Sequence, residues 1–146
     1  MRFRIVILAL IVAVPMLSLG LNNDEEISRL IERAQSAPVD QQSGLCVQIA
    51  THELKSANEL YTEDKVNEAR VALNNVVTYS DKASSAAIQS GKHLKDTEIA
   101  MRKMADKLRD IKLKLTIDDQ GPVQAASEHL ETLRTSLLNH MFKGKK

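Results

Sequence analysis

The sequence predicts an all-α fold, and three observations lead to that prediction. Ala, Leu, Lys and Glu, which favour helix, are abundant after residue 20. Pro and Gly are few in that part, and except for Gly44 they lie near expected helix ends or bends. Apolar residues recur every three or four positions over most of its length, which is the spacing of one helix face.

Residues 1–20 have the features of a signal peptide. Two arginines begin the segment, an apolar run of ten residues follows at 5–14, and the small residues Ser18 and Gly20 precede a cut before Leu21. The run is shorter than the roughly 20 residues that a bilayer span needs. We therefore expect cleavage, a secreted or periplasmic protein and no transmembrane span afterwards. An uncleaved N-terminal anchor is the alternative.

Two helices are expected first, over residues 24–37 and 40–61. Asn23 can cap the first helix, acidic residues suit its positive end, and Pro38 ends it. The second helix has a broad apolar face. Cys46, the only cysteine, lies on that face, so we expect a small buried hydrophobe and no intramolecular disulfide.

The longest expected helix begins at residue 65 or 66 and ends near residue 115. From Val66 onward, apolar or small residues recur at alternating steps of three and four, and the phase never changes. This pattern is typical of a long helix with a sustained seam against its neighbours. Gly91 lowers helix propensity, but no proline or polar turn accompanies it. We expect one long central helix, bent near Gly91. The alternative is a four-helix bundle with a break there.

The last expected helix covers residues 122–142, because Pro122 suits a first helical turn and a loop is expected at 116–121. Residues 21–146 then form a single all-α domain. In it, shorter antiparallel helices cover the long central helix, as in a helical hairpin or coiled coil. Two of them would lie end to end along it. Such a seam leaves an apolar strip uncovered, which predicts a protein partner or a homodimer.

One segment, residues 54–77, has the residue spacing of a paired helical hairpin. Its small and large apolar positions are Ala57, Leu60, Tyr61, Val66, Ala69 and Leu73. The segment resembles one unit of the tetratricopeptide type, although no second copy follows at a fixed period. The resemblance implies peptide binding in a groove. The chain as a whole looks like small exported helical proteins of bacteria that have no assigned role.

The residues that carry catalysis in other proteins form no recognisable pattern here. There is no nucleophile-elbow pattern, no phosphate-binding loop and no zinc-protease spacing of histidines. A copper site would need His140 and Met141 beside Glu98 and Met101, but methionine commonly fills helix seams. We therefore expect a non-enzymatic protein, with no catalytic residue, no cofactor and no metal ligand assigned.

Charge is unevenly divided along the chain. The formal net charge of the full chain is +1, which gives no reason to bind nucleic acid. Residues 21–79 carry 10 acids and 5 bases, and residues 80–146 carry 9 acids and 13 bases. The basic residues of the second part crowd one expected helix. We take eight of them, the basic set, as a candidate interaction surface: Lys92, Lys95, Arg102, Lys103, Lys107, Arg109, Lys112 and Lys114.

Two interpretations of the basic set remain open. It is a solvated face, tempered by interspersed aspartates, or it attaches the protein to an anionic envelope surface. Opposite halves of two chains would also attract one another in an antiparallel pair. Together these observations predict an exported, non-catalytic helical scaffold or adaptor that acts through protein–protein contacts. The alternative is a binder of envelope ligands, such as anionic lipid, cell-wall polymer or metal.

Overall fold

The computed structural model describes residues 19–144, and within them it contains five helices and no strand. The prediction of an all-α fold is confirmed. The helices are α1 (Leu19–Ser36), α2 (Val39–Thr62), α3 (Val66–Ser90), α4 (Leu94–Leu113) and α5 (Ile117–Lys143).

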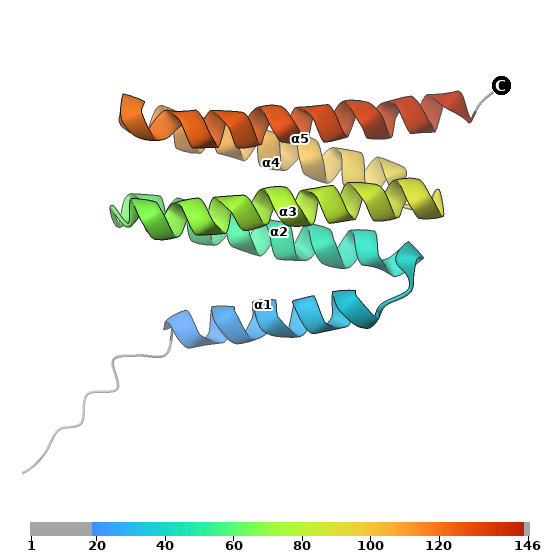
Figure 1. Ribbon diagram of the computed structural model, residues 1–146, viewed down its shortest axis with the longest axis horizontal. Helices are drawn as coiled ribbons and strands as arrows, with labels where there is room; N and C mark the ends of the chain where they lie inside the picture. Colours follow the sequence, from blue (N-terminus) through green and yellow to red (C-terminus); the bar gives the residue numbers. More distant parts are fainter. Residues whose placement is uncertain (1–18, 145–146) are drawn as a thin grey trace, which may run out of the picture.

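The helices form two antiparallel hairpins that are stacked on one another (Figure 1). The first hairpin is α2 with α3, and the second is α4 with α5. The two hairpins have the same orientation, so α4 lies along α2 and α5 lies along α3. α1 packs against α2 at the outer side of the first hairpin, where it runs parallel to α3 (Figure 1).

The prediction of one continuous helix from residue 66 to 115 is wrong, and the alternative break near Gly91 is present. The backbone is left-handed at Gly91 (φ 68°) and again at His93 (φ 61°). The Gly91 N–H donates to the carbonyl of Ala87 at 2.9 Å, which closes the last turn of α3. Two left-handed residues within three positions reverse the chain without any proline. As a result, the two short helices do not lie end to end.

The other helix boundaries differ less from the expected ones. α5 begins at Ile117, so the expected loop at 116–121 is mostly helical and Pro122 lies inside α5. Asp118 and Asp119 favour this earlier start, because acidic side chains stabilise the positive end of a helix. The expected cut before Leu21 falls in the first turn of α1, and residues 1–18 lie outside the described part of the chain.

The predicted seam forms the core instead of an exposed strip. Met101 and Leu108 are fully buried, and Ala83 and Ala87 on α3 have no exposed surface either. The second hairpin and α2 cover the seam from several sides, which a single long helix would not have allowed. Cys46 is 4% exposed and belongs to this core, as expected for a small buried hydrophobe. No helix among residues 19–144 has the length and apolar character that crossing a membrane requires.

Candidate interaction surfaces

The basic set predicted from the sequence lies on α4 and at its two ends. Lys92 precedes the helix in the connection from α3, and Lys114 follows its last residue. All eight side chains are exposed except Lys112, which is half-buried. These cations therefore all lie on α4 or at its ends, on the side of the bundle that α5 and α2 do not cover.

Three members of the basic set have partners in the fold. Lys92 lies 3.4 Å from Asp40 at the start of α2, and Arg109 contacts Glu131 of α5 at 3.3 Å as well as Asp106. Hydrogen bonding to Asp106 is the main reason that the pKa of Arg109 is raised. Lys112 donates to the side-chain oxygen of a glutamine on α5 at 3.1 Å.

The other five members have no such partner. These five are Lys95, Arg102, Lys103, Lys107 and Lys114. Within residues 19–144, no carboxylate oxygen lies within 4.0 Å of their cationic groups. Three aspartates of α4, at positions 96, 106 and 110, share its exposed side. The outer side of α4 is thus densely charged, with an excess of positive groups.

Arg134 of α5 contacts α4 in a way that the sequence did not reveal. Its Nε donates to Glu98 at 2.6 Å, and a second nitrogen contacts Glu131 at 3.3 Å. Glu98 is only 7% exposed, and its hydrogen bond to Arg134 is the first cause of the raised pKa of that arginine. A buried carboxylate needs such a partner. This ion pair joins the two helices of the α4–α5 hairpin.

The approach of His140 to Glu98 that a copper site would need does not occur. His140 instead places Nδ1 2.9 Å from the carbonyl oxygen of Ser136 on its own helix, and Glu98 is occupied by Arg134. α5 is therefore displaced along α4 relative to the copper arrangement considered above. Within residues 19–144, no group of three His, Cys, Asp or Glu side chains is placed to hold a metal ion.

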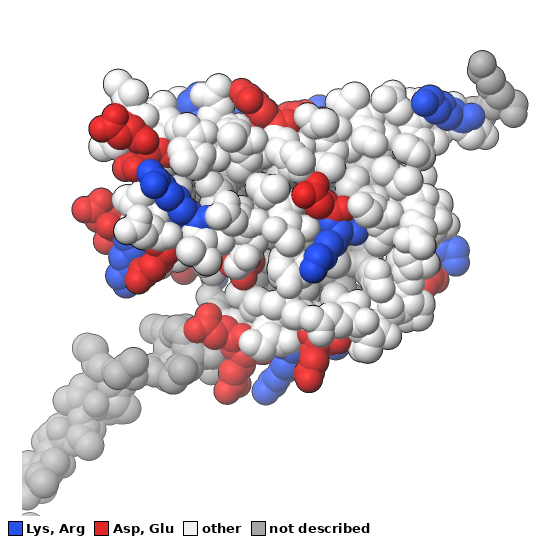
Figure 2. Space-filling model, in the orientation of Figure 1, with Lys and Arg blue, Asp and Glu red and all other residues white. Residues whose placement is uncertain are grey.

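α3 and α5 together form a surface with few charges, which we call the front face. Each helix presents a stripe of seven exposed residues, and each stripe contains a single charged side chain. The stripe of α3 is Asn67, Val71, Asn74, Thr78, Lys82, Ser85 and Gln89. The stripe of α5 is Gly121, Ala125, Glu128, Thr132, Thr135, Asn139 and Phe142. In Figure 2, Lys, Arg, Asp and Glu gather at the left end of this side, and the rest of it is mostly white with a few charged groups.

The charges that lie between these two stripes are paired with each other. Arg70 of α3 contacts Asp119 of α5 at 3.3 Å. Asp81 of α3 lies 2.6 Å from Nε2 of His129 on α5. These contacts join the two hairpins along the front face, and the side chains of Arg70, Asp81 and His129 stay partly exposed there.

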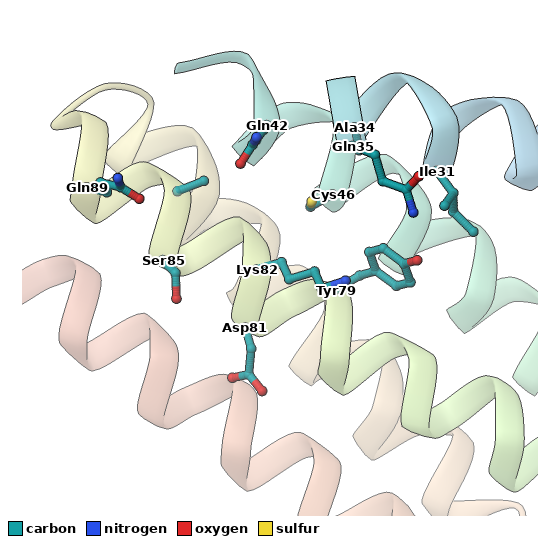
Figure 3. A pocket seen from close by; sticks show the side chains of 11 residues that line it. Ile31, Ala34, Gln35, Gln42, Cys46, Tyr79, Asp81, Lys82, Ser85 and Gln89 are labelled. Atoms are coloured by element: carbon teal, nitrogen blue, oxygen red, sulfur yellow. The ribbon is translucent and has the colours of Figure 1, made fainter. Parts of the chain in front are cut away.

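A cleft lies between α1 and α3, with α2 as its floor (Figure 3). Its volume is about 430 Å³. Cys46 on α2 and Tyr79 on α3 contribute to its wall, and Ile31 of α1 closes the opposite side. Burial raises the pKa of the Cys46 thiol, and the nearby Lys82 ammonium partly opposes this change. Burial is also the main cause of the raised pKa of Tyr79.

Comparisons of the chain with protein-family models, with curated proteins and with solved structures find no match. The local geometry alone therefore has to carry any functional argument. The sequence located the basic set, but it missed the front face and the cleft. The front face had a detectable signal, since its uncharged exposed residues recur at helical spacing in both stripes. The cleft had none, because three separate helices form it.

Proposed function

We propose that the chain is an exported, non-catalytic helical scaffold or adaptor that binds a partner protein through the front face. The observation that carries this proposal is the presence of only two charged side chains among the fourteen exposed residues of its two stripes. Charged residues make up 27% of the chain, and most protein surfaces concentrate them further. The central part of a protein–protein interface is depleted in charged residues.

The stacking of the two hairpins supports the same proposal. Parallel pairs of helices, α2 with α4 and α3 with α5, give a broad and rigid surface without loops across it. Helical-repeat proteins bind their partners on surfaces made in this way. The tetratricopeptide resemblance of residues 54–77 falls on the first of these hairpins. Peptide binding by that hairpin remains a proposal of the same class.

Site-specific photocrosslinking in the producing cell tests the proposal. A photoreactive residue is placed at Thr78 or Thr132 on the front face, and at Arg102 or Lys107 on α4 as a matched control. We expect a discrete crosslinked protein from the two front-face positions, which is lost when Thr78 and Thr132 are both changed to Glu. Mass spectrometry of that species shows whether the partner is another protein or a second copy of the chain. The absence of any front-face adduct contradicts the proposal.

A second candidate function rests on the five basic residues of α4 that have no carboxylate partner. An exposed helix with this excess of cations suits contact with an anionic envelope surface. Changing Lys103, Lys107 and Lys114 to Glu should then release the protein from envelope fractions. Wild-type attachment should also weaken steeply between low and moderate salt, because exposed charges are screened. A front-face complex is expected to survive the same change in salt.

Export is tested separately by the intact mass of the protein recovered outside the cytoplasm. The expected mature chain begins at Leu21 and keeps most of α1, including Leu30 and Ala34, which belong to the core. A mass that includes Met1 contradicts cleavage. Recovery from the inner membrane then supports the anchor instead.

A further inference from the structure

We infer that the cleft between α1 and α3 binds a small amphipathic monocarboxylate, with the carboxylate at Lys82 and the apolar tail over Tyr79 and Cys46. The cleft opens on the α1 side of the first hairpin, and it shares Lys82, Ser85 and Gln89 with the α3 stripe of the front face. Its volume of about 430 Å³ falls in the range of small-molecule sites.

The wall of the cleft is apolar where a tail would lie. Ile31 and Ala34 project from α1, Cys46 rises from the floor on α2, and the ring of Tyr79 faces them from α3 (Figure 3). Ala86 of α3 also lines the cleft. Ala34, Cys46 and Ala86 are buried, so the apolar surface that the cleft leaves exposed belongs mainly to the half-buried Ile31 and Tyr79. An alkyl chain in the gap would remove that surface from water, which is the main source of affinity for such ligands.

Lys82 supplies the cation for the headgroup. Its ammonium lies 4.8 Å from the centre of the Tyr79 ring, at the edge of the cleft. No carboxylate oxygen among residues 19–144 lies within 4.0 Å of it. The neighbouring Asp81 does not neutralise it, because that side chain points away toward α5 and contacts His129 (Figure 3). The amide of Gln89 also lines the cleft and can donate a further hydrogen bond.

A second cleft in the same gap determines the orientation of the ligand. It lies farther along α1 and α3 and is lined by Asp24, Glu53 and Glu68. Within the described residues, none of these carboxylates has a cationic group within 4.0 Å. They would repel a carboxylate headgroup. Lys82 therefore attracts an anionic headgroup at one end of the gap, and the three acids repel one at the other end. A dicarboxylate long enough to span the gap is disfavoured for the same reason.

The chain lacks tryptophan, which makes a sensitive binding experiment possible. A Gln35→Trp variant places a fluorophore on the rim of the cleft, and a Thr132→Trp variant places one on α5 as a control. Each is titrated with dodecanoate, dodecanol and dodecylamine below their micelle concentrations. We expect saturable dodecanoate binding to the rim reporter and none to the control. In the rim reporter, Lys82→Gln should weaken that binding about threefold to tenfold, while Lys95→Gln on α4 leaves it unchanged.

The native thiol gives a second readout in the otherwise unchanged chain. Dodecanoate should slow the alkylation of Cys46 by N-ethylmaleimide, because the tail covers the sulfur. Equal binding of dodecanoate and dodecylamine, or an unchanged affinity in the Lys82→Gln variant, overturns the proposal. A vesicle arm separates a free ligand from a lipid surface. Lys82-dependent sedimentation with phosphatidylglycerol vesicles, without dodecanoate binding, assigns the cation to a membrane and also overturns it.

Discussion

The two hairpins have the same orientation but are held together by different means. Seven of the nine buried residues of α3 are alanine or serine, whereas the buried side of α4 contains two methionines, a leucine and an isoleucine. Within residues 19–144, no ion pair joins α2 to α3, but Arg134 and Arg109 both connect α5 to α4. In the first hairpin, the small side chains of α3 thus pack against α2, whose buried residues include Leu45, Ile49 and Leu54. The second hairpin depends on large side chains and charged contacts.

This difference shows that the two hairpins should fail in opposite ways. A tightly packed interface of small residues has no room for added volume, so it is sensitive to overpacking. An interface of large side chains instead leaves a cavity when one of them is truncated. Truncation in the second hairpin and added volume in the first therefore test this contrast.

Leu108→Ala should cause the largest loss of stability. Leu108 is fully buried on α4, and its truncation should lower the free energy of unfolding by about 2–5 kcal/mol, because lost burial and a residual cavity act together. Leu113→Ala on the same helix is the matched control. Leu113 is 79% exposed, so its change should stay within about 0.5 kcal/mol. Similar losses from both variants in denaturant unfolding would contradict the assigned faces of α4.

Ala87→Leu tests the first hairpin by addition instead of removal. Ala87 has no exposed surface on α3, so three extra carbon atoms should cost about 1–3 kcal/mol through strain. Ala125→Leu, on the exposed stripe of α5, should change stability by less than about 0.5 kcal/mol. If Ala87→Leu is tolerated as well as Ala125→Leu, the α2–α3 interface is not closely packed, and the contrast between the hairpins fails.

Gly91→Ala tests the connection between the two hairpins. The positive φ of Gly91 is unfavourable for alanine, so the variant should be less stable by about 1–2 kcal/mol. Gly44→Ala is the control within α2. An added Cβ there meets no atom within 4 Å, so it should stabilise the protein by up to about 1 kcal/mol. A continuous helix through residue 91 would instead make both changes stabilising.

The break at Gly91 also shows what the sequence could and could not provide. Apolar spacing correctly placed Met101, Leu108 and Ala87 in the core, because burial of a helix face depends on local periodicity. The same spacing continued across the break by coincidence. After the three-residue reversal a new helix begins, and the preceding helix does not determine which of its faces points toward the core. Periodicity alone therefore could not distinguish a bend from a turn, although the glycine itself was a valid signal.

The candidate sites differ in predictability for the same physical reason. The basic set is contiguous in sequence and was found on one helix, as expected. The pairing of Glu98 with Arg134 and the cleft around Cys46 depend on how separate helices are placed side by side. Tertiary placement of this kind follows from the hairpin stacking, which the expected long helix had excluded.

Glu53→Gln should have the smallest effect, and it concerns a charge that the first hairpin partly buries. Burial is the main cause of the raised pKa of Glu53, and a hydrogen bond from Asn75 lowers it only partly. The folded state therefore holds this proton more tightly than the unfolded state does. Its contribution to stability is present at low pH and is lost as the pH rises through the folded pKa. At neutral pH, the glutamine variant should be more stable than the wild type.

The pH dependence of that difference is the decisive measurement. In urea unfolding followed from pH 7 to pH 3, the advantage of Glu53→Gln should shrink as wild-type Glu53 becomes protonated. Asn75→Ala should make the wild-type pH dependence steeper, because it removes the hydrogen bond that stabilises the charged carboxylate. A constant offset between wild type and Glu53→Gln across this range would show that Glu53 is fully solvated. The α1–α3 gap would then be more open at its acidic end than at Lys82.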